Sequence, residues 1–533
     1  MTKFVVYNFP NRKNYGFTEF YQKAESMRDK LDTVSPSICL AKWLQVSINL
    51  TNGTTQSCYH PPPHVIPIKE LKLDVGALHN TEHKKQERKL MLSGKRPEGC
   101  NYCWRVEDAG QGNHLSDRHY KSSEWWAVDQ FDDVTSKDHS YKVLPKYVEV
   151  NFNRTCNFKC MYCSPHISTT WQEEIEQFGP YKVLDYVHND LSFLKKDGFM
   201  PLEVANKDNP YVEAFWKWWP DLYPGLRVFR MTGGEPLLDK NTFKVLDYVI
   251  EHPNNKLELS ITSNLCPTDQ KLYDKFINKV KQIETVKQLV DKDTFPGKEF
   301  LYYDKGVKHF WLYVSFDSVG AQAEYIRTGL EFDRMVENIK IFLRETRFST
   351  ISFINTFNIL SIPGLKGYLQ LILDLRTEFG GAGQIEEFIL PELNPAEKFY
   401  SLKPKGFQKK KFQRIYFDIP LLNYPNWLDV RNATPDLINM TKECLEFMKN
   451  NEQDKNYLTT FQGFKPHEIL KLERNISIME ESFDNETLRK NRKQFYEWIQ
   501  QYDKRRNLNF LETFPEMKRF YGQCKNLSRS IYA

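Results

Sequence analysis

The chain contains 533 residues, with 74 basic and 69 acidic side chains that leave a net charge of +5. So small an excess gives little support to nucleic-acid binding, and 40% hydrophobic with 14% aromatic residues exclude a wholly disordered chain. No run of about 18 apolar residues predicts a membrane span, and the first residues lack the apolar core of a signal peptide. We therefore expect a cytoplasmic protein whose thiols are reduced or metal-bound.

After an N-terminal segment of residues 1–36, the stretch 37–125 is expected to form a small cysteine-rich α+β domain. Its four cysteines are Cys39, Cys58, Cys100 and Cys103. The first two flank a predicted β-hairpin with the turn signal Asn52-Gly53, and the last two form a CxxC pair. Four thiolates can complete a structural zinc site, in which His60 or His64 could replace one of them. They can equally saturate an iron–sulfur cluster, and the residues alone leave both alternatives open.

Between residues 145 and 395, short β-rich runs alternate with segments of helical periodicity. The β-rich runs are 146–152, 226–232, 257–262, 310–316, 350–357 and 385–390. Helical periodicity is clearest in 241–252, 333–345 and 365–379. This alternation predicts an α/β fold with a parallel sheet and right-handed crossovers. Six such units favour a partial, TIM-like (β/α)6 barrel over a closed barrel of eight units.

Polar motifs follow the first four β-rich runs. The first motif is the loop CNFKCMYC, which contains Cys156, Cys160 and Cys163. The later motifs are GGEP at 233–236, the pair Ser263-Asn264 and the S-x-D segment at 315–317. Because chemistry in such barrels collects at the carboxyl ends of the strands, we expect these motifs to belong to one site.

The three cysteines of the CNFKCMYC loop are spaced CxxxCxxC, and thiolates suit both zinc and iron–sulfur clusters. His166 could supply the fourth ligand that a structural zinc site needs. A [4Fe–4S] cluster held by only three cysteines would instead keep one iron open, as catalysis at a metal requires. Both interpretations are compatible with the cysteines alone.

Residues 396–533 are expected to be mainly helical, with amphipathic patterns at 434–451 and 485–506. The basic stretch 402–414 is typical of a solvated face. Three further cysteines have no partner at ligand spacing and are expected to be small buried hydrophobic side chains: Cys266, Cys444 and Cys524.

The ordered motifs of residues 145–395 resemble the radical S-adenosylmethionine (SAM) superfamily. The match is to its CxxxCxΦC signature, where Φ is aromatic and is Tyr162 in this chain. The resemblance implies a [4Fe–4S] cluster held by Cys156, Cys160 and Cys163, whose open iron binds SAM and cleaves it reductively to a 5′-deoxyadenosyl radical. The cofactor supplies the difficult chemistry, and the protein binds and orients it.

The same resemblance implies which residues contact SAM. The GGEP motif would bind the methionyl amino group, the S-x-D segment the ribose hydroxyls, and a following arginine the SAM carboxylate. An asparagine after the fifth run would lie near ribose or adenine, and the aromatic residue of the cysteine loop near adenine. The residues concerned are Tyr162, Gly233, Gly234, Glu235, Ser263, Asn264, Ser315, Asp317, Arg327 and Asn358.

Residues 37–125 resemble the twitch or SPASM-type auxiliary-cluster domains of radical SAM enzymes. The pattern C…W…G…C followed by P…C…CW is matched by Cys39, Trp43, Gly53, Cys58, Pro97, Cys100, Cys103 and Trp104. The resemblance implies a second [4Fe–4S] cluster held by the four cysteines. One departure is that such domains usually follow the barrel, whereas this stretch precedes it, so zinc stays the alternative.

The sequence therefore predicts a radical SAM enzyme that depends on SAM and on a reductant protein such as a flavodoxin or ferredoxin. The resemblance implies a peptide or protein as substrate, with a sugar or small metabolite as the alternative. A non-catalytic, zinc-stabilised binding protein is the alternative from another class. It would explain the cysteines but not the ordered GGEP and S-x-D motifs.

Overall fold

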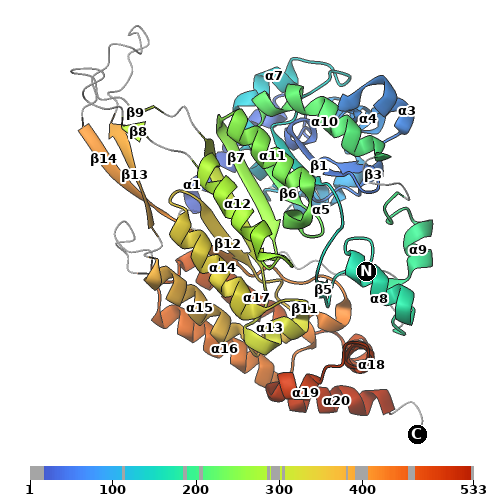
Figure 1. Cartoon of the computed structure of the whole chain (residues 1–533). Coiled ribbons are helices and arrows are strands. Elements are labelled where there is room, and N and C mark those ends of the chain that lie inside the picture. The colour runs from blue at the N-terminus through green and yellow to red at the C-terminus, as the bar shows by residue number, and fades with distance from the viewer. Residues whose placement is uncertain are drawn as a thin grey trace. The chain divides into compact units, whose positions relative to one another are not determined.

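The computed structural model describes residues 17–110, 114–183, 189–202, 208–284, 288–289, 301–302, 306–379, 382–389, 406–453 and 462–529. The chain divides into two compact units. Unit 1 contains the described residues up to Asn153, together with 200–233 and 256–258; unit 2 contains those of 154–199, 234–255 and 259–533 (Figure 1). The predicted domain 37–125 lies within unit 1, whereas the predicted barrel of 145–395 is divided between the units. The predicted domain boundaries themselves stay predictions.

Five strands of unit 1 lie in one sheet in the order β6-β4-β1-β2-β3. Their bounds are β1 Gln45–Asn49, β2 Thr54–Gln56, β3 His64–Val65, β4 Tyr147–Asn151 and β6 Val228–Thr232. β1, β4 and β6 are parallel, and β2 pairs antiparallel with both β1 and β3. The predicted hairpin is confirmed, with Ser47 opposite Gln56 and Gly53 in the left-handed region at φ 69°. A Cβ at Gly53 would also lie 2.0 Å from the Tyr211 ring. Both the backbone conformation and the lack of space therefore require glycine in this turn.

The two faces of these strands differ in character. One face is apolar and almost inaccessible, through Val46, Ile48, Val148, Val150, Phe229 and Met231. The aromatic rings of Phe215 and Trp219 on α10 (Pro210–Leu222) pack on this face, with Trp219 at 4.9 Å from Phe229. The other face is polar, with Ser47, Glu149 and Arg230 side by side across β1, β4 and β6. The remaining helices of unit 1 are α1 (Phe17–Asp32), α2 (Ala41–Leu44), α3 (Ile68–Leu73), α4 (Glu82–Leu92), α5 (Asn101–Ala109), α6 (Asp117–Ser122) and α7 (Phe131–Thr135).

Unit 2 contains strands in the order β15-β12-β10-β7. Their bounds are β7 Asn254–Ser263, β10 Val307–Ser315, β12 Thr350–Ile354 and β15 Ile415–Asp418. β12 is parallel to both β10 and β15. The helices before the C-terminal region are α8 (Thr169–Phe178), α9 (Leu191–Lys196), α11 (Lys240–Glu251), α12 (Gln270–Ile283), α13 (Gly320–Ile326), α14 (Phe332–Glu345) and α15 (Leu365–Glu378). The α/β class and a large parallel sheet are thus confirmed; closure into a partial barrel stays a prediction.

The prediction that residues 385–390 form the sixth strand of the barrel is wrong. Its described part lies in β13 (Ala382–Ile389), which pairs antiparallel with β14 (Gly406–Gln413) in a separate two-stranded sheet, visible in Figure 1. The place beside β12 belongs to β15 instead. A parallel strand covered on both faces needs a mostly apolar run. The sequence of β13 is polar at Gln384, Glu386 and Glu387, whereas Ile415 and Phe417 of β15 are buried.

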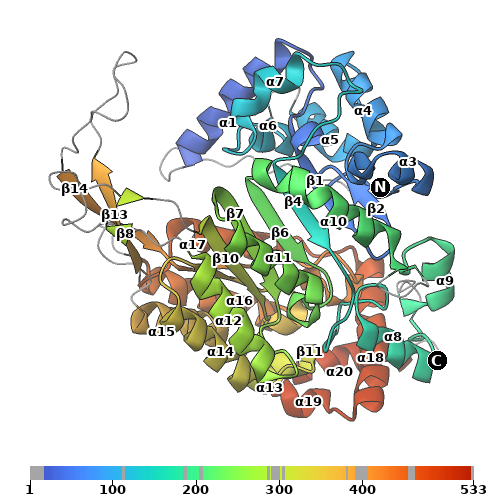
Figure 2. The ribbon, with the colours of Figure 1, turned by 45° about the horizontal axis from the view of Figure 1, so that its top comes forward.

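The described part of the predicted C-terminal region 396–533 begins with the strands β14 and β15 and is mainly helical from Pro435 onward (Figure 2). Its helices are α16 (Pro435–Asn450), α17 (Pro466–Glu480), α18 (Asn485–Arg506), α19 (Phe510–Thr513) and α20 (Lys518–Arg529). α18 and α20 pack against each other through rings such as Phe495 and Phe520, whose centroids are 5.0 Å apart. The three unpaired cysteines, Cys266, Cys444 and Cys524, are buried, which confirms that prediction. Within the ranges given above, no helix has both the length and the apolar character to cross a membrane.

Candidate functional site

The three-cysteine loop lies in unit 2, between β4 and α8 in the sequence. Two of its residues form β5 (Lys159–Cys160), which pairs antiparallel with β11 (Arg327–Thr328), so that Cys160 faces Arg327. A tight turn brings the Cys163 amide to the Cys160 carbonyl at 3.0 Å, and the Phe158 amide donates to Cys156 Sγ at 3.4 Å. Burial, together with the neighbouring Cys160, raises the pKa of the Cys156 thiol to about 12. The fold therefore brings the predicted thiols together.

The GGEP motif packs on the chain that enters this loop. Gly233 has φ 131°, a backbone conformation that favours glycine. A Cβ on Gly234 would lie 2.3 Å from the Thr155 carbonyl oxygen, closer than any side chain can approach. The Glu235 amide donates to the same carbonyl at 2.7 Å. Glycine is thus required here by close backbone approach.

Glu235 joins two of the predicted motifs. Its carboxylate is buried and accepts hydrogen bonds from Ser263 Oγ at 2.8 Å, from the Asn264 amide at 2.7 Å and from the Leu237 amide at 2.9 Å. Burial raises the pKa of Glu235 to about 7, although these three donors oppose the shift. Glu235, Ser263 and Asn264 are therefore close together, as predicted from their order in the chain.

Asn157 connects this group to the cysteine loop and was not predicted. Asn264 Nδ2 donates to Asn157 Oδ1 at 2.9 Å, and Asn157 Nδ2 donates to the Cys266 carbonyl at 2.8 Å. The available signal was its place directly after Cys156 within the motif. Asn157 thus fixes the loop relative to the end of β7.

The pKa of Glu235 makes the stability of the metal-free protein depend on pH. Since its folded-state pKa of about 7 lies above the ordinary value of 4.5, the folded state binds the proton more tightly than the unfolded state. This stabilisation is complete below pH 4.5 and is lost as the pH rises through 7, about 3 kcal/mol in all. In Glu235→Gln, the free energy of unfolding measured in urea should no longer show this fall between pH 4.5 and pH 7. If the free energy of unfolding depends on pH in the same way in Glu235→Gln and in the wild-type protein, the raised pKa is contradicted.

A second network surrounds Cys160 and contains three of the predicted residues. Arg327 donates from Nε to Asp317 Oδ2 at 2.8 Å and from Nη2 to Asp317 Oδ1 at 3.2 Å. Tyr162 donates to Asp317 Oδ2 at 2.7 Å and also contacts Arg327. Arg327 Nη1 points to Cys160 Sγ at 3.6 Å. The guanidinium is therefore engaged by Asp317 and by the central thiol of the loop.

Two of the predicted residues, Asn358 and Ser315, belong to neither hydrogen-bond network in the described structure. Asn358 is buried and serves the local turn, accepting from the Leu360 amide at 3.0 Å and donating to the Thr356 carbonyl at 2.8 Å. Ser315 ends β10 and is half-buried; its hydroxyl makes no hydrogen bond to any residue that the structure describes. Neither side chain joins the Arg327 or the Glu235 network in the described structure.

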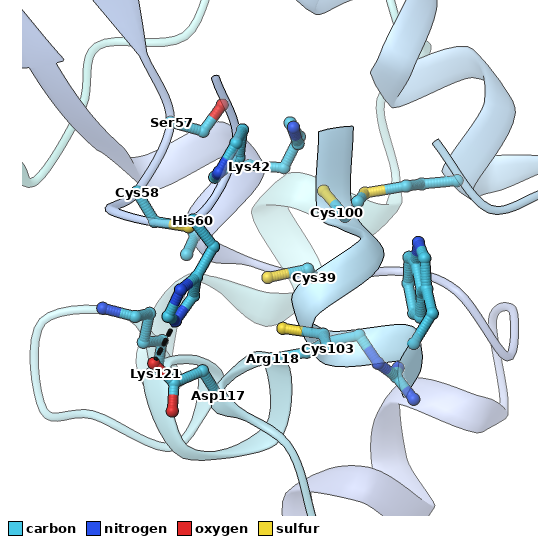
Figure 3. A pocket seen from close by; sticks show the side chains of 14 residues that line it. Cys39, Lys42, Ser57, Cys58, His60, Cys100, Cys103, Asp117, Arg118 and Lys121 are labelled. Carbon is cyan, nitrogen blue, oxygen red and sulfur yellow. Dashed lines mark hydrogen bonds and ion pairs between the residues drawn. The ribbon is translucent and has the colours of Figure 1, made fainter. Parts of the chain in front are cut away.

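The four N-terminal cysteines line one pocket of unit 1, and their side chains converge in Figure 3. They come from four places in the chain: Cys39 before α2, Cys58 after β2, Cys100 at the start of α5 and Cys103 within it. His60 also lines the pocket, but its Nε2 is paired with Asp117 Oδ2 at 2.7 Å. His64 lies outside this pocket, and its Nε2 is bonded to Thr81 Oγ1 at 2.8 Å. The predicted grouping of four cysteines is therefore present.

Metal occupancy is a separate matter. Among the side chains that the structure describes, no three His, Cys, Asp or Glu residues are spaced as a ready metal-ligand set. This holds for the three-cysteine loop and for the N-terminal pocket alike. The metal content of both cysteine groups therefore stays a prediction.

Comparison with known proteins finds partial similarity in sequence. No family model matches the chain. In sequence it is 27% identical over 149 residues to the GTP 3′,8-cyclase of Trichodesmium erythraeum. The matched segment covers 28% of this chain and 36% of that relative. The GTP 3′,8-cyclase of Campylobacter lari is 25% identical over 135 residues, with 25% and 32% covered. These similarities support the predicted resemblance to radical SAM enzymes over about a quarter of the chain. The chain spans about a third of the length of these curated relatives.

A structural neighbour is SuiB of Streptococcus suis, whose structure is bound to S-adenosylmethionine. SuiB is 13% identical to this chain, and the match covers 62% of this chain and 60% of SuiB with a TM-score of 0.27. SuiB bound to its precursor peptide SuiA gives a TM-score of 0.26. A likeness this weak supports no argument about geometry or substrate.

The residues of unit 2 fit the cofactors of a radical SAM protein. Three thiols lie on one short loop, which suits a cluster with an open iron. The missing side chain of Gly234 leaves backbone to approach a ligand. Arg327 places a positive charge beside Cys160 Sγ, where a metal–thiolate centre would be negative.

The N-terminal pocket also fits a metal held by thiolates, and the argument is electrostatic. Four cationic side chains of the described part of unit 1 are almost fully buried: Lys42, Lys84, Arg88 and Arg118. Only two carboxylates are buried with them, Glu87 and Glu107. A divalent metal held by four thiolates carries a net double negative charge, as does a [4Fe–4S] cluster in its usual oxidised state. Such an occupant would offset the excess of buried positive charge.

Individual contacts agree with this electrostatic argument. Lys42 lines the pocket and is bonded to Glu87 Oε2 at 2.8 Å. Burial raises the pKa of the Cys100 thiol to about 11, and the charge of Lys42 opposes that shift. The ammonium of Lys84 is hydrogen-bonded to Thr55 Oγ1 at 2.9 Å and to His79, and burial lowers its pKa well below the ordinary value. An uncompensated buried lysine is costly, so a neighbouring anionic centre would stabilise it.

Proposed function

We propose that the chain is a SAM-dependent radical enzyme in which Cys156, Cys160 and Cys163 hold a [4Fe–4S] cluster with one open iron. When bound, the cluster and SAM supply a 5′-deoxyadenosyl radical that abstracts hydrogen from a substrate. The observation that carries the proposal is the enclosure of the three-thiol loop by two networks. One runs from Glu235 through Asn264 to Asn157, and the other joins Arg327, Asp317 and Tyr162.

The residues of this chain would act by binding and orienting. Gly233, Gly234 and Glu235 would receive the amino group of SAM, because two positions there require bare backbone and a buried carboxylate lies next to them. A cation beside Glu235 would also lower its raised pKa and so bind more tightly as the pH rises. This pH dependence of SAM binding follows directly from the burial of Glu235.

In the second network, Arg327 would serve the SAM carboxylate while it orients Cys160. Asp317 would hold Arg327 and Tyr162 in place, and Ser315 has a hydroxyl free for the ribose within the described structure. Asn358 would act on the ribose or adenine only indirectly, through the turn that it caps.

The proposed electron donor is a flavodoxin or ferredoxin, and the proposed substrate is a peptide or protein. Both follow from the resemblance of the N-terminal stretch to auxiliary-cluster domains of enzymes that modify peptides. The sequence relatives are named for a reaction of GTP, but they share only about a third of their length with this chain. We therefore do not propose GTP as the substrate.

We further propose that Cys39, Cys58, Cys100 and Cys103 hold a second [4Fe–4S] cluster with no open iron. Four thiolates saturate such a cluster, so it would bind no SAM. Two buried cationic side chains, Lys42 and Arg118, line the pocket of these cysteines, and unit 1 as described has more buried cations than buried carboxylates. Zinc would satisfy the same charge balance, so the metal must be measured.

One experiment tests both cluster proposals. Anaerobically reconstituted protein should bind about eight irons, because two clusters of four are expected. Its EPR signal should change in part when SAM is added to the reduced protein. The triple variant Cys156, Cys160, Cys163→Ala should keep about half of the iron and give a signal that SAM does not affect.

The control is the matching variant of the N-terminal pocket, Cys39, Cys58, Cys100, Cys103→Ala. It should keep about half of the iron, and its EPR signal should respond to SAM. If the variant Cys156, Cys160, Cys163→Ala binds zinc and no iron, the N-terminal pocket is a zinc site. A wild-type signal indifferent to SAM, with the clusters present, would contradict the proposed function.

A further inference from the structure

The last turn of α18 carries a guanidinium that is buried against the catalytic cysteine loop. The side chain of Arg506 is 1% exposed. Its Nη1 donates to the Lys159 carbonyl at 2.6 Å and to Thr328 Oγ1 at 2.9 Å. Lys159 and Thr328 are register partners in the β5–β11 pair, next to the Cys160–Arg327 pair. Arg506 therefore ties together the two strands that hold Cys160.

A buried carboxylate completes the attachment. Glu174 of α8 is 2% exposed and accepts from Arg506 Nε at 3.0 Å and from Nη2 at 3.3 Å. The same carboxylate lies 3.0 Å from the ammonium of Lys159 and accepts from the Tyr181 hydroxyl at 2.6 Å. Because α8 follows the cysteine loop, the Arg506–Glu174 pair joins the middle of that loop, at Lys159, and the helix after it to the C-terminal helix α18.

The peptide groups on both sides of Cys160 are held by this arrangement. Arg506 binds the carbonyl of the preceding residue, and Trp171 Nε1 donates to the Cys160 carbonyl at 2.8 Å. The guanidinium of Arg506 in turn lies 5.0 Å from the Trp171 ring and 4.0 Å from the Tyr502 ring. Tyr502 donates to the Tyr325 carbonyl at 2.7 Å, just before β11. The backbone of Cys160 is thus fixed from α8 and α18 together.

We infer that Arg506 is a positioning residue for Cys160, and that the C-terminal helix α18 is part of the machinery that shapes the catalytic cysteine loop. The inference rests on the proposed function only in taking this loop to be the cluster-binding loop. Arg506 acts on the loop before any metal is present, so that the central thiol is already oriented when a cluster is assembled. The C-terminal region thereby gains a role that its sequence does not suggest.

The neighbouring Arg505 provides a matched control. It lies on the same turn of α18 and donates to the Gly179 carbonyl at 2.9 Å and to the Pro180 carbonyl at 3.2 Å. It also stacks on Tyr181 at 3.8 Å. Arg505 therefore anchors α18 beyond α8, whereas Arg506 anchors it at the cysteine loop.

The test uses the full-length, metal-free protein and measures the alkylation rate of each cysteine by iodoacetamide and peptide mapping. Hydrogen bonds to a charged group are worth about a ten- to hundredfold change in an equilibrium. Arg506→Ala should therefore raise the alkylation rate of Cys160 about tenfold or more. Arg505→Ala should leave it within about twofold of wild type. Arg506→Lys should recover part of the protection, because an ammonium can reach the Lys159 carbonyl but cannot fork onto Glu174.

A second readout follows reconstitution, in which Arg506→Ala should shift the midpoint potential of the SAM-responsive cluster and Arg505→Ala should not. Equal Cys160 alkylation in the two alanine variants would overturn the inference. If Arg506→Ala does not fold, Thr328→Val removes one of its acceptors, and unchanged Cys160 alkylation in that variant would overturn the inference as well. Since alkylation is measured without metal, a wild-type protein that fails to cleave SAM would refute the proposed function and leave this result standing.

Discussion

Arg327→Ala is expected to lower the free energy of unfolding by about 3–5 kcal/mol, the usual cost of removing one partner of a buried ion pair. The cause is Asp317, whose side chain is fully buried and whose carboxylate would lose both of its hydrogen bonds from Arg327. The same change removes the guanidinium that points to Cys160 Sγ. Affinity for SAM should fall about ten- to a hundredfold, as for the loss of one charge-assisted hydrogen bond.

The control for this prediction is Arg376→Ala. Arg376 and Glu468 also form a fully buried ion pair in unit 2, at 2.7 Å, with 0% and 2% exposure. The other hydrogen bonds of Arg376 go to the Gly463 and Ile415 carbonyls, and Glu468 also accepts from the Lys465 amide. None of these partners belongs to the cysteine loop. Chemical denaturation should find both variants destabilised, whereas calorimetry should find weaker SAM binding only in Arg327→Ala. Equal SAM affinity in the two variants would remove Arg327 from the binding site.

Gly234→Ala should reduce SAM cleavage about a hundredfold or more while the fold survives. A Cβ at this position would lie 2.3 Å from the Thr155 carbonyl oxygen and 2.5 Å from the Arg154 carbonyl carbon, so backbone must move. A displacement of about 1 Å at a reactive site can cost about a hundredfold in rate. The displaced segments are the GGEP turn and the start of the cysteine loop, where SAM is proposed to bind.

Gly522→Ala is the matched control. Gly522 lies in α20, and a Cβ there would meet nothing within 4 Å. Alanine should therefore be neutral or should stabilise the helix by up to about 1 kcal/mol. Product formation is compared by chromatography at equal iron content. Activity of Gly234→Ala near that of Gly522→Ala would show that the GGEP turn tolerates a side chain and is not a SAM-binding element.

Local patterns in the sequence predicted much of the fold. The helical periodicity of 241–252, 333–345 and 365–379 corresponds to α11, α14 and α15 within one or two residues at each end. The Asn52-Gly53 turn predicted the β1–β2 hairpin because few other residues adopt its positive φ. Each of these signals depends on neighbours in the sequence, which is why it could be seen without a structure.

The order of the motifs likewise predicted part of the site. Glu235, Ser263 and Asn264 follow successive strands, and the structure joins them by hydrogen bonds. The same reasoning does not distinguish a ligand contact from a local cap, and Asn358 is occupied by its own turn. Which predicted residues touch SAM therefore stays a prediction.

Other features depend on distant parts of the chain and could not be predicted. The strand beside β12 is β15 and not the run 385–390, because burial on a parallel sheet outweighs β-propensity. Arg506 lies 347 residues after Lys159, and its basic neighbours Lys504 and Arg505 made it resemble an ordinary helix end. Only a contact between two segments so far apart could identify it.

The central claim is that the three-cysteine loop supports reductive cleavage of SAM. The most direct measurement is chromatography of 5′-deoxyadenosine formed by reduced, reconstituted protein, compared with Cys160→Ala. We expect at least one product molecule per wild-type protein and none above background in the variant, because Cys160 is the thiol held by β11, Trp171 and Arg327. No 5′-deoxyadenosine from wild-type protein, with its catalytic cluster present and reduced, would contradict the account.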